Sequence, residues 1–265
     1  MIFRSVRLIT FDATNTLIQL SSKIGTEYAK IGSIYGVKDS DNPIRIEKLN
    51  SEFCTSYAHF NKLLPNFGYH HNISPVEWWS KVVLSSFENS GFELNDPSER
   101  KRIESTAAHL YKLYSRGSHW RLKDGAHDLL FELRKRNPEI ELSILSNFDE
   151  RLEAILHDLG IANFFKNLFI SHRIGLAKPD EELYQHVLKK HQISDPKTEY
   201  IHVGDSIELD YKPVTEIIGA RALLVNQQLM SMGSEHIRSL GVEPGFVFSS
   251  LIDVQKFLLG SQFPF

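Results

Sequence analysis

Short apolar runs recur along the chain, and each is followed by a turn signal and a stretch with helical periodicity. The apolar runs lie at residues 8–11, 142–145, 168–170, 201–203, 222–225 and 246–248. The stretches expected to form crossover helices are residues 124–136, 150–159, 180–191 and 210–218. Strands that alternate with helices predict an α/β fold built on a parallel sheet. Ligands of such sheets bind beyond the carboxyl ends of the strands, so candidate chemistry is sought there.

A long helical segment separates the first apolar run from the second. Residues 18–117 show helical periodicity and no convincing strand, and the segment is too long for a simple connection. Helices are expected at residues 25–35, 43–61, 75–90 and 98–114, with Gly, Pro and Asn breaks between them. The sequence therefore predicts a core domain of residues 1–17 and 118–265, and an inserted helical domain of residues 18–117.

Composition describes an ordinary globular protein and argues against a nucleic-acid partner. The chain has 265 residues, of which 42% are hydrophobic, enough to bury a core. Its formal charge of -3 and its pI near 6.5 provide no basic field for a nucleic-acid backbone. A small anionic substrate would therefore have to be held by local groups.

Cysteine content and hydropathy indicate in which cellular compartment the protein is expected. Cys54 is the only cysteine, so the chain has no internal disulfide and no multi-cysteine metal site. The first residues lack the long apolar stretch of a secretory signal, and no later segment is long and apolar enough to cross a membrane. We expect a cytoplasmic or other reducing intracellular location and no membrane partner.

Polar side chains with catalytic potential stand at or near the ends of several predicted strands. Asp12 follows the first apolar run, and Ser146-Asn147 closes the second. Lys178 precedes a proline-started helix. Asp205 and Asp210 follow Gly204, which comes directly after the fourth run. Each has an ordinary explanation as a turn, a helix cap or a solvated side chain. Their joint order along one sheet favours a common site, in which carboxylates so spaced suit a hard divalent cation.

In this order of residues the chain resembles the haloacid dehalogenase superfamily. The four motifs of that superfamily match Asp12 with Thr16, Ser146, Lys178, and Asp205 with Asp210. The strings Leu-Ser-Asn, Lys-Pro-Asp and Val-Gly-Asp-Ser are close to the family form. The resemblance implies a Rossmann-like hydrolase core with a helical cap inserted after the first motif.

Details of the helical segment resemble one branch of this superfamily, the branch similar to rhythmically expressed protein 2. They are Gly25 with Glu27-Tyr28, the turn at residues 65–68, and Trp78-Trp79 ahead of an apolar helix. The tryptophan pair is expected to pack within the helical domain rather than to form a stacking platform.

The resemblance implies a role for each matching residue. Asp12 would attack phosphorus and form an aspartyl-phosphate, while Lys178 and Ser146 would stabilise the transferring group. Asn147 and Thr16 would contact a small phosphorylated substrate. Magnesium would be held by Asp12, the backbone carbonyl of Thr14, Asp205 and Asp210. Asn15 replaces a family glycine and is expected to adopt a left-handed conformation.

Thr14 departs from the family pattern. Phosphatases of the family carry a second aspartate there, which protonates the leaving group and activates water. Threonine cannot move that proton near neutral pH. Three functions therefore stay open: a weak or selective small-molecule phosphatase, a catalytically silent regulatory protein that binds metal and phosphate, and a 2-haloacid dehalogenase-like hydrolase acting at carbon.

Overall fold

The structure is a computed structural model that describes residues 5–260, and these residues divide into two compact units. The sheet unit takes the described residues of Met1–Gln19, Arg121–Asn147 and Leu159–Phe265. The helical unit comprises Leu20–Trp120 and Phe148–Asp158. The helical unit thus corresponds to the long helical segment of the sequence with a second, short segment added to it.

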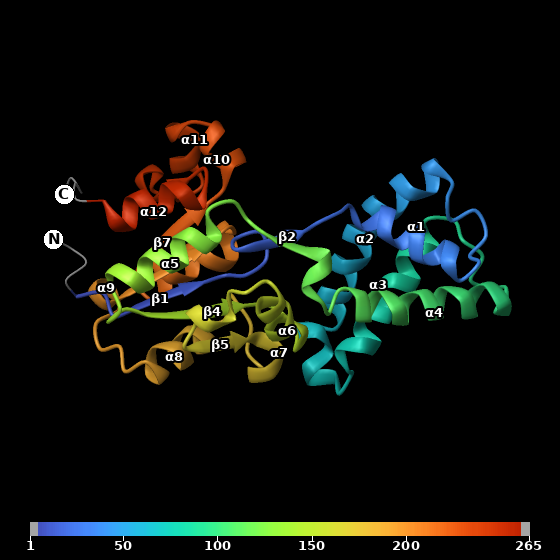
Figure 1. The fold of residues 1–265 in the computed structure, drawn as a ribbon, viewed down its shortest axis with the longest axis horizontal. Helices are drawn as coiled ribbons and strands as arrows, with labels where there is room; N and C mark the ends of the chain where they lie inside the picture. The colour runs from blue at the N-terminus through green and yellow to red at the C-terminus, as the bar shows by residue number, and fades with distance from the viewer. Residues whose placement is uncertain (1–4, 261–265) are drawn as a thin grey trace. The chain divides into compact units, whose positions relative to one another are not determined.

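The sheet unit is built on a parallel sheet in which the first strand lies in the interior (Figure 1). Its strands are β1 (Leu8–Phe11), β4 (Glu141–Ser146), β5 (Asn167–Ile170), β6 (Tyr200–Gly204), β7 (Arg221–Val225) and β8 (Val247–Phe248). Their order is β5-β4-β1-β6-β7-β8, and all neighbours pair in parallel. Each strand coincides with a predicted apolar run, so the predicted α/β parallel fold is confirmed. The order sets the carboxyl ends of β4 and β6 on either side of the end of β1.

Helices pack against this sheet and bury its apolar side chains. They are η4 (Ala162–Phe164), α5 (Ala126–Arg136), α7 (Ser171–Ile174), α8 (Glu181–Lys190), α9 (Pro196–Glu199), η5 (Ile207–Tyr211), η6 (Pro213–Ile217), α10 (Gln227–Ser231), α11 (Ser234–Ser239), η7 (Pro244–Phe246) and α12 (Leu251–Leu259). Helix α5 contacts α12, and α8 contacts η6. Leu183 and Val187 of α8 share one core cluster with Leu8 of β1. The expected helix over 210–218 is instead the two π-helical turns η5 and η6.

The main helices of the helical unit begin at residues that favour a helix start. The unit contains α1 (Ile24–Ile34), α2 (Pro43–Leu63), η2 (Asn66–His71), α3 (Pro75–Asn89), α4 (Pro97–Leu113), η3 (Gly117–His119) and α6 (Arg151–Asp158). Asn42, Ser74 and Asp96 cap α2, α3 and α4, and each is followed by proline. Trp78 is fully buried within this unit, which confirms its predicted packing role.

A two-stranded sheet was not expected from the sequence. Strand β2 (Ile18–Leu20) pairs with β3 (Trp120–Leu122), and the chain passes between the two units within these strands. The expectation of no strand in 18–117 was therefore wrong at the start of that segment. The strands have three residues each, too few to show an alternating pattern, and the partners are far apart in the chain.

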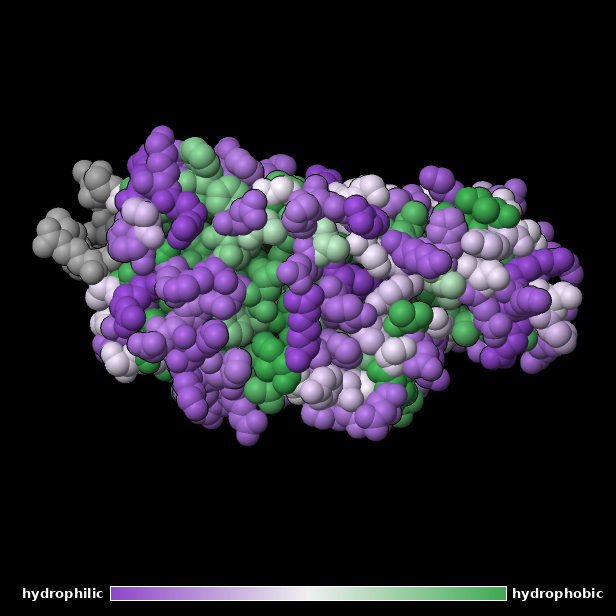
Figure 2. All heavy atoms as spheres, turned by 60° about the horizontal axis from the view of Figure 1, so that its bottom comes forward, coloured by the Kyte–Doolittle hydropathy of each residue, from purple (hydrophilic) through white to green (hydrophobic). Residues whose placement is uncertain are grey.

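The surface is mainly hydrophilic on the face drawn in Figure 2, with hydrophobic atoms emerging between polar ones. Some large apolar side chains are exposed in each unit, among them Ile44 in the helical unit and Ile217 in the sheet unit. Across residues 5–260, none of the helices is both long enough and apolar enough to span a membrane.

Candidate active site

Asp12 stands at the carboxyl end of β1, where the chain turns sharply. The strand before it is wholly buried, and the Asp12 N–H donates to the Val203 carbonyl of β6 at 2.8 Å. Beyond it, the N–H groups of Leu17 and Ile18 both donate to the Ala13 carbonyl. Asn15 has a φ of 63°, which confirms the left-handed conformation expected of it. This turn presents the Asp12 carboxylate at the edge of the sheet, and the Asp12 side chain is only 9% exposed.

Lys178 joins Asp12 to Asp210. Its ammonium donates to Asp12 Oδ1 at 2.7 Å and to Asp210 Oδ1 at 2.6 Å, and the Lys178 side chain is only 2% exposed. The Asn147 amide fixes the lysine backbone, because it accepts from Lys178 N and donates to Lys178 O, both at 2.8 Å. The end of β4 therefore holds the loop that carries Lys178.

Asp210 is engaged on both of its carboxylate oxygens. Oδ1 accepts from Lys178 and from His202 Nε2, at 2.6 and 3.0 Å. Oδ2 accepts from the backbone N–H groups of Asp205 and Ser206, at 3.1 and 2.9 Å. These four donors match the four lone-pair sites of a carboxylate.

Gly204 makes room for that carboxylate. A Cβ atom at this position would lie 2.2 Å from Cγ of Asp210, far inside van der Waals contact. Only glycine therefore allows Asp210 to lie against the end of β6. The glycine of the Gly-Asp string thus has a steric reason that the sequence alone did not provide.

Among the described residues, the Asp205 carboxylate has fewer hydrogen-bond partners than the Asp210 carboxylate. Thr16 Oγ1 donates to Asp205 Oδ1 over 3.4 Å, a long hydrogen bond. Burial, and then the charges of Asp12 and Asp210, raise the pKa of Asp205 to about 7. Ser146 is buried at the end of β4, beside β1.

Burial and charge act in opposite directions on the groups around Lys178. Burial raises the pKa of the Asp12 carboxyl, and the Lys178 charge only partly offsets it. Burial would lower the pKa of Lys178, but Asp12 and Asp210 outweigh it and hold that pKa above its usual range. Burial likewise opposes ionisation of Asp210, but Lys178 and His202 outweigh it and keep the pKa of Asp210 low. Lys178 and Asp210 are therefore an ion pair.

The structure thus brings most of the predicted site residues into one connected group. Hydrogen bonds link Asp12, Lys178, Asp210, Asp205, Thr16 and Asn147. Substrate contact by Asn147 and Thr16 stays a prediction, since their side chains here bond to Lys178 and Asp205. In the described part of the chain, no group of three or more His, Cys, Asp or Glu side chains is arranged to hold a metal ion.

His202 belongs to this site and was missed by the sequence interpretation. It is a fully buried residue of β6 that touches Asp210 directly. The available signal was a histidine inside the apolar string Tyr-Ile-His-Val-Gly, since an imidazole buried in a central strand needs partners.

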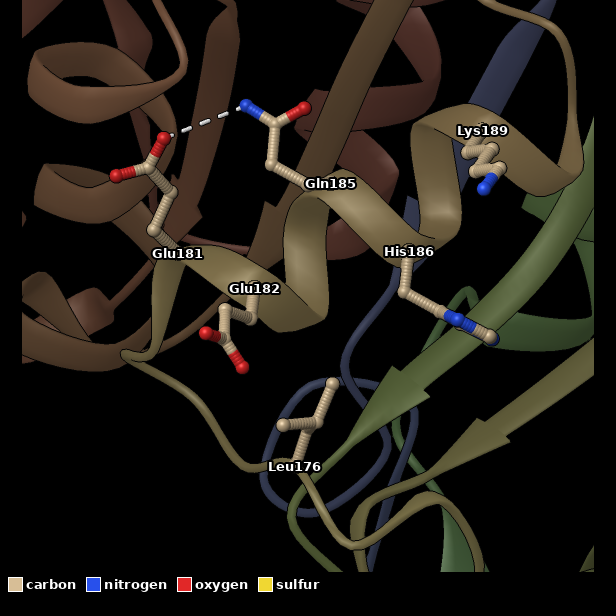
Figure 3. A pocket seen from close by; sticks show the side chains of 6 residues that line it. All are labelled: Leu176, Glu181, Glu182, Gln185, His186 and Lys189. Atoms are coloured by element: carbon tan, nitrogen blue, oxygen red, sulfur yellow. Dashed lines mark hydrogen bonds between the residues drawn. The ribbon is translucent and has the colours of Figure 1, made fainter.

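A hollow on the surface of α8 is lined by other residues than those of the candidate active site. Leu176 and five side chains of α8 line it, and Figure 3 shows Glu181 bonded to Gln185 across one turn. His186 points away from that pair in the same view. None of the predicted catalytic or metal-binding residues lines the hollow.

Comparison with known proteins gives matches over most of the chain. Residues 6–213 match the family of haloacid dehalogenase-like hydrolases. Rhythmically expressed gene 2 protein of Drosophila melanogaster is 30% identical over 257 residues, covering 94% of each chain. Human haloacid dehalogenase-like hydrolase domain-containing protein 3 is 30% identical over 238 residues, covering 88% of this chain and 89% of the relative.

Solved structures share the fold at lower identity. The magnesium-bound HAD-hydrolase YfnB of Bacillus subtilis superposes with a TM-score of 0.63 at 19% identity, covering 96% of this chain and 99% of YfnB. The L-2-haloacid dehalogenase RSc1362 gives a TM-score of 0.63 at 16% identity, with the same coverage. Because both are less than 20% identical to this chain, the likeness shows the fold alone.

Proposed function

Because the chain belongs to the family of haloacid dehalogenase-like hydrolases, we propose that it is a magnesium-dependent phosphatase that acts on a small molecule through Asp12. One observation carries the proposal. A carboxylate at the end of β1 is bonded to a buried lysine that a second carboxylate holds in place. Such a group can present a nucleophile and neutralise an anionic substrate at the same point.

The donor groups fit a magnesium ion. Magnesium prefers oxygen ligands, and the Asp12 carboxylate, the Thr14 carbonyl and the Asp205 carboxylate supply them. Burial is the main cause of the raised pKa of Asp205, and the charges of Asp12 and Asp210 add to it; a bound cation would relieve that repulsion. The sequence also predicted Asp210 as a ligand. Its lone pairs face Lys178, His202 and two backbone N–H groups instead, so we propose that its role is to hold Lys178. Bound magnesium would screen the charge between the carboxylates and the phosphoryl oxygens.

The proposed reaction has two steps. An oxygen of Asp12 attacks phosphorus, the bond to the leaving oxygen breaks, and an aspartyl-phosphate forms. Water then attacks that phosphorus, releases inorganic phosphate and restores the carboxylate. Two N–H groups of Lys178 are used by Asp12 and Asp210, so its third can donate to a phosphoryl oxygen, with Ser146 as a further donor.

Thr14 restricts the substrates that this mechanism accepts. No acid at that position can protonate a departing alkoxide. Aryl and acyl phosphates need no such proton because their leaving groups are weak bases. We therefore propose that the substrate is a small phosphorylated molecule with a good leaving group, or that turnover is slow.

The test is a rate measurement with purified protein and magnesium against an acyl phosphate, an aryl phosphate, an alkyl phosphate and a 2-haloacid. We expect turnover of the first two, loss of it in Asp12→Asn, and loss of it when magnesium is chelated. Equal rates for the wild type and Asp12→Asn would contradict the proposal. Chloride or bromide release from the haloacid would favour a dehalogenase instead.

A silent binding protein is the second candidate, and Thr14 is the observation that favours it. Such a protein would keep the metal and phosphate contacts but lack the proton transfer. Calorimetry with magnesium and inorganic phosphate separates the two: binding without turnover of any phosphate would identify the regulatory protein.

A further inference from the structure

Behind the carboxylates, a line of polar side chains crosses one face of the sheet. His202 of β6 and Thr10 of β1 are paired residues of neighbouring parallel strands, so their side chains stand side by side. Thr10 Oγ1 lies 2.7 Å from His202 Nδ1 and 2.7 Å from the Tyr200 hydroxyl. All three residues are buried to 99% or more within the sheet.

The hydrogens of this line can be assigned from its ends. The pKa of Asp210 is held low, so its carboxylate accepts, and His202 must donate from Nε2. His202 then accepts at Nδ1 from the Thr10 hydroxyl, and Thr10 accepts from the Tyr200 hydroxyl. Burial raises the pKa of Tyr200, so that hydroxyl stays protonated. Every member of the line is satisfied, and one tautomer of His202 is selected.

The line ends on the carboxylate that holds Lys178. His202 Nε2 and Lys178 Nζ bond to the same oxygen, Asp210 Oδ1. Residues of β6 alternate between the two faces of the sheet, so His202 and Gly204 share the face on which Asp210 lies. The Asp210 carboxylate is thus fixed by the His202 side chain and by the backbone N–H groups of Asp205 and Ser206 at the end of β6.

We propose that His202 is a positioning residue: its Nε2–H holds the Asp210 carboxylate, and through it the Lys178 ammonium, in the place where that ammonium serves Asp12. The inference rests on the proposed function, in which Lys178 acts on Asp12. Without the His202 donor, Asp210 Oδ1 would lose one of its two partners, and the carboxylate could rotate and draw the ammonium with it.

Three variants separate positioning from simple stability. His202→Phe keeps a ring but removes both nitrogens. His202→Gln keeps an amide donor near the position of Nε2. Ile201→Ala removes buried volume on the other face of the same strand, so it destabilises the sheet without touching the polar line.

Turnover of an aryl phosphate is the first measurement. We expect His202→Phe to lower kcat by about 10–10²-fold with KM little changed, because a small displacement of a catalytic group has effects of that size. His202→Gln should recover most of the lost kcat, and Ile201→Ala should keep kcat despite a lower Tm. Equal losses in His202→Phe and Ile201→Ala at similar Tm would overturn the inference.

The second measurement does not need turnover. A buried, ion-paired lysine ammonium exchanges its hydrogens slowly, so Lys178 should give a separate ¹H–¹⁵N ammonium signal, assigned by its loss in Lys178→Met. The signal should persist in His202→Gln and be lost or strongly shifted in His202→Phe. An unchanged signal in His202→Phe would refute positioning. If the wild type has no activity that Asp12→Asn abolishes, the proposed function fails, and this signal alone decides the role of His202.

Discussion

Thr14 occupies the position at which the resemblance predicts a second aspartate, and its hydroxyl cannot act as an acid near neutral pH. We expect Thr14→Asp to raise the rate on an alkyl phosphate by about 10²–10⁴-fold, the usual range for general acid–base catalysis. The gain on an aryl phosphate should be smaller because that leaving group needs no proton. Steady-state rates of both substrates for the wild type and Thr14→Asp provide the measurement. A fast wild-type rate on the alkyl phosphate would show that another residue supplies the proton.

If Asp205 is a magnesium ligand, as proposed, it links proton binding to metal binding. Its pKa is raised from 3.8 to about 7, so the metal-free folded state holds one more proton than the unfolded state between those two values. The contribution of Asp205 to the free energy of unfolding therefore falls as pH rises from about 4 to about 7. In the proposed function, magnesium would bind the ionised carboxylate and compete with that proton.

We accordingly expect the rise in Tm caused by magnesium to grow as pH increases through 7. In Asp205→Asn, which cannot ionise, this growth should be absent. Thermal unfolding followed by circular dichroism, with magnesium and with chelator at several pH values, measures it. The same magnesium effect on Tm in both proteins at all pH values would remove Asp205 from the metal site.

At the scale of elements, a buried ion pair holds the start of α6 within the helical unit. Arg151 bonds to both oxygens of Asp149, at 2.8 and 2.7 Å, and both side chains are almost wholly buried. Trp79 Nε1 donates to Asp149 as well, and the Arg151 guanidinium lies 4.8 Å from the Trp79 ring centroid and 4.6 Å from that of Tyr111. These contacts explain why Phe148–Asp158 clusters with the helices.

Breaking this pair should be costly, because it leaves a buried charge without its partner. We expect Asp149→Ala to lower the free energy of unfolding by about 3–5 kcal/mol. Glu104→Ala breaks the exposed pair with Arg100 and should cost only about 0.3–0.5 kcal/mol. All three tryptophans, Trp78, Trp79 and Trp120, lie in the helical unit, so tryptophan fluorescence during denaturation reports its unfolding. Similar costs for the two variants would contradict this account of α6.

The whole molecule combines a sheet unit that carries the candidate active site with a helical unit, and the resemblance implies that the helical unit is a cap. A cap that closes over Asp12 would exclude water and admit only small substrates. We expect free phosphotyrosine to be hydrolysed and the same phosphotyrosine within a folded protein to resist. The two substrates share one leaving group, so the comparison isolates size. Equal kcat/KM for both would argue against a closing cap.

Local pattern was enough to predict the strands of the parallel sheet and to place candidate site residues at or near their ends. The predicted run 8–11 coincides with β1, and the run 201–203 lies within β6, because strands buried on both faces are mainly apolar along their length. Asp12 was recognised by its place after such a run, Lys178 by its place before a proline-started helix, and both by family motifs. The expected helix starts at residues 43, 75 and 98 lie at or next to those of α2, α3 and α4, which Asn42, Ser74 and Asp96 cap within a single turn.

The tertiary structure alone decided which side chains meet and what each one holds. Asp210 shows this: its spacing from Asp205 suited a metal ligand, but its oxygens face Lys178, His202 and two backbone N–H groups. His202 bonds to Thr10 because β1 and β6 pair in that register. Strand β2 forms because it pairs with β3, which lies far along the chain. Such pairings depend on strand order, register and packing, whereas a sequence pattern records only the burial and turn preference of its own few residues.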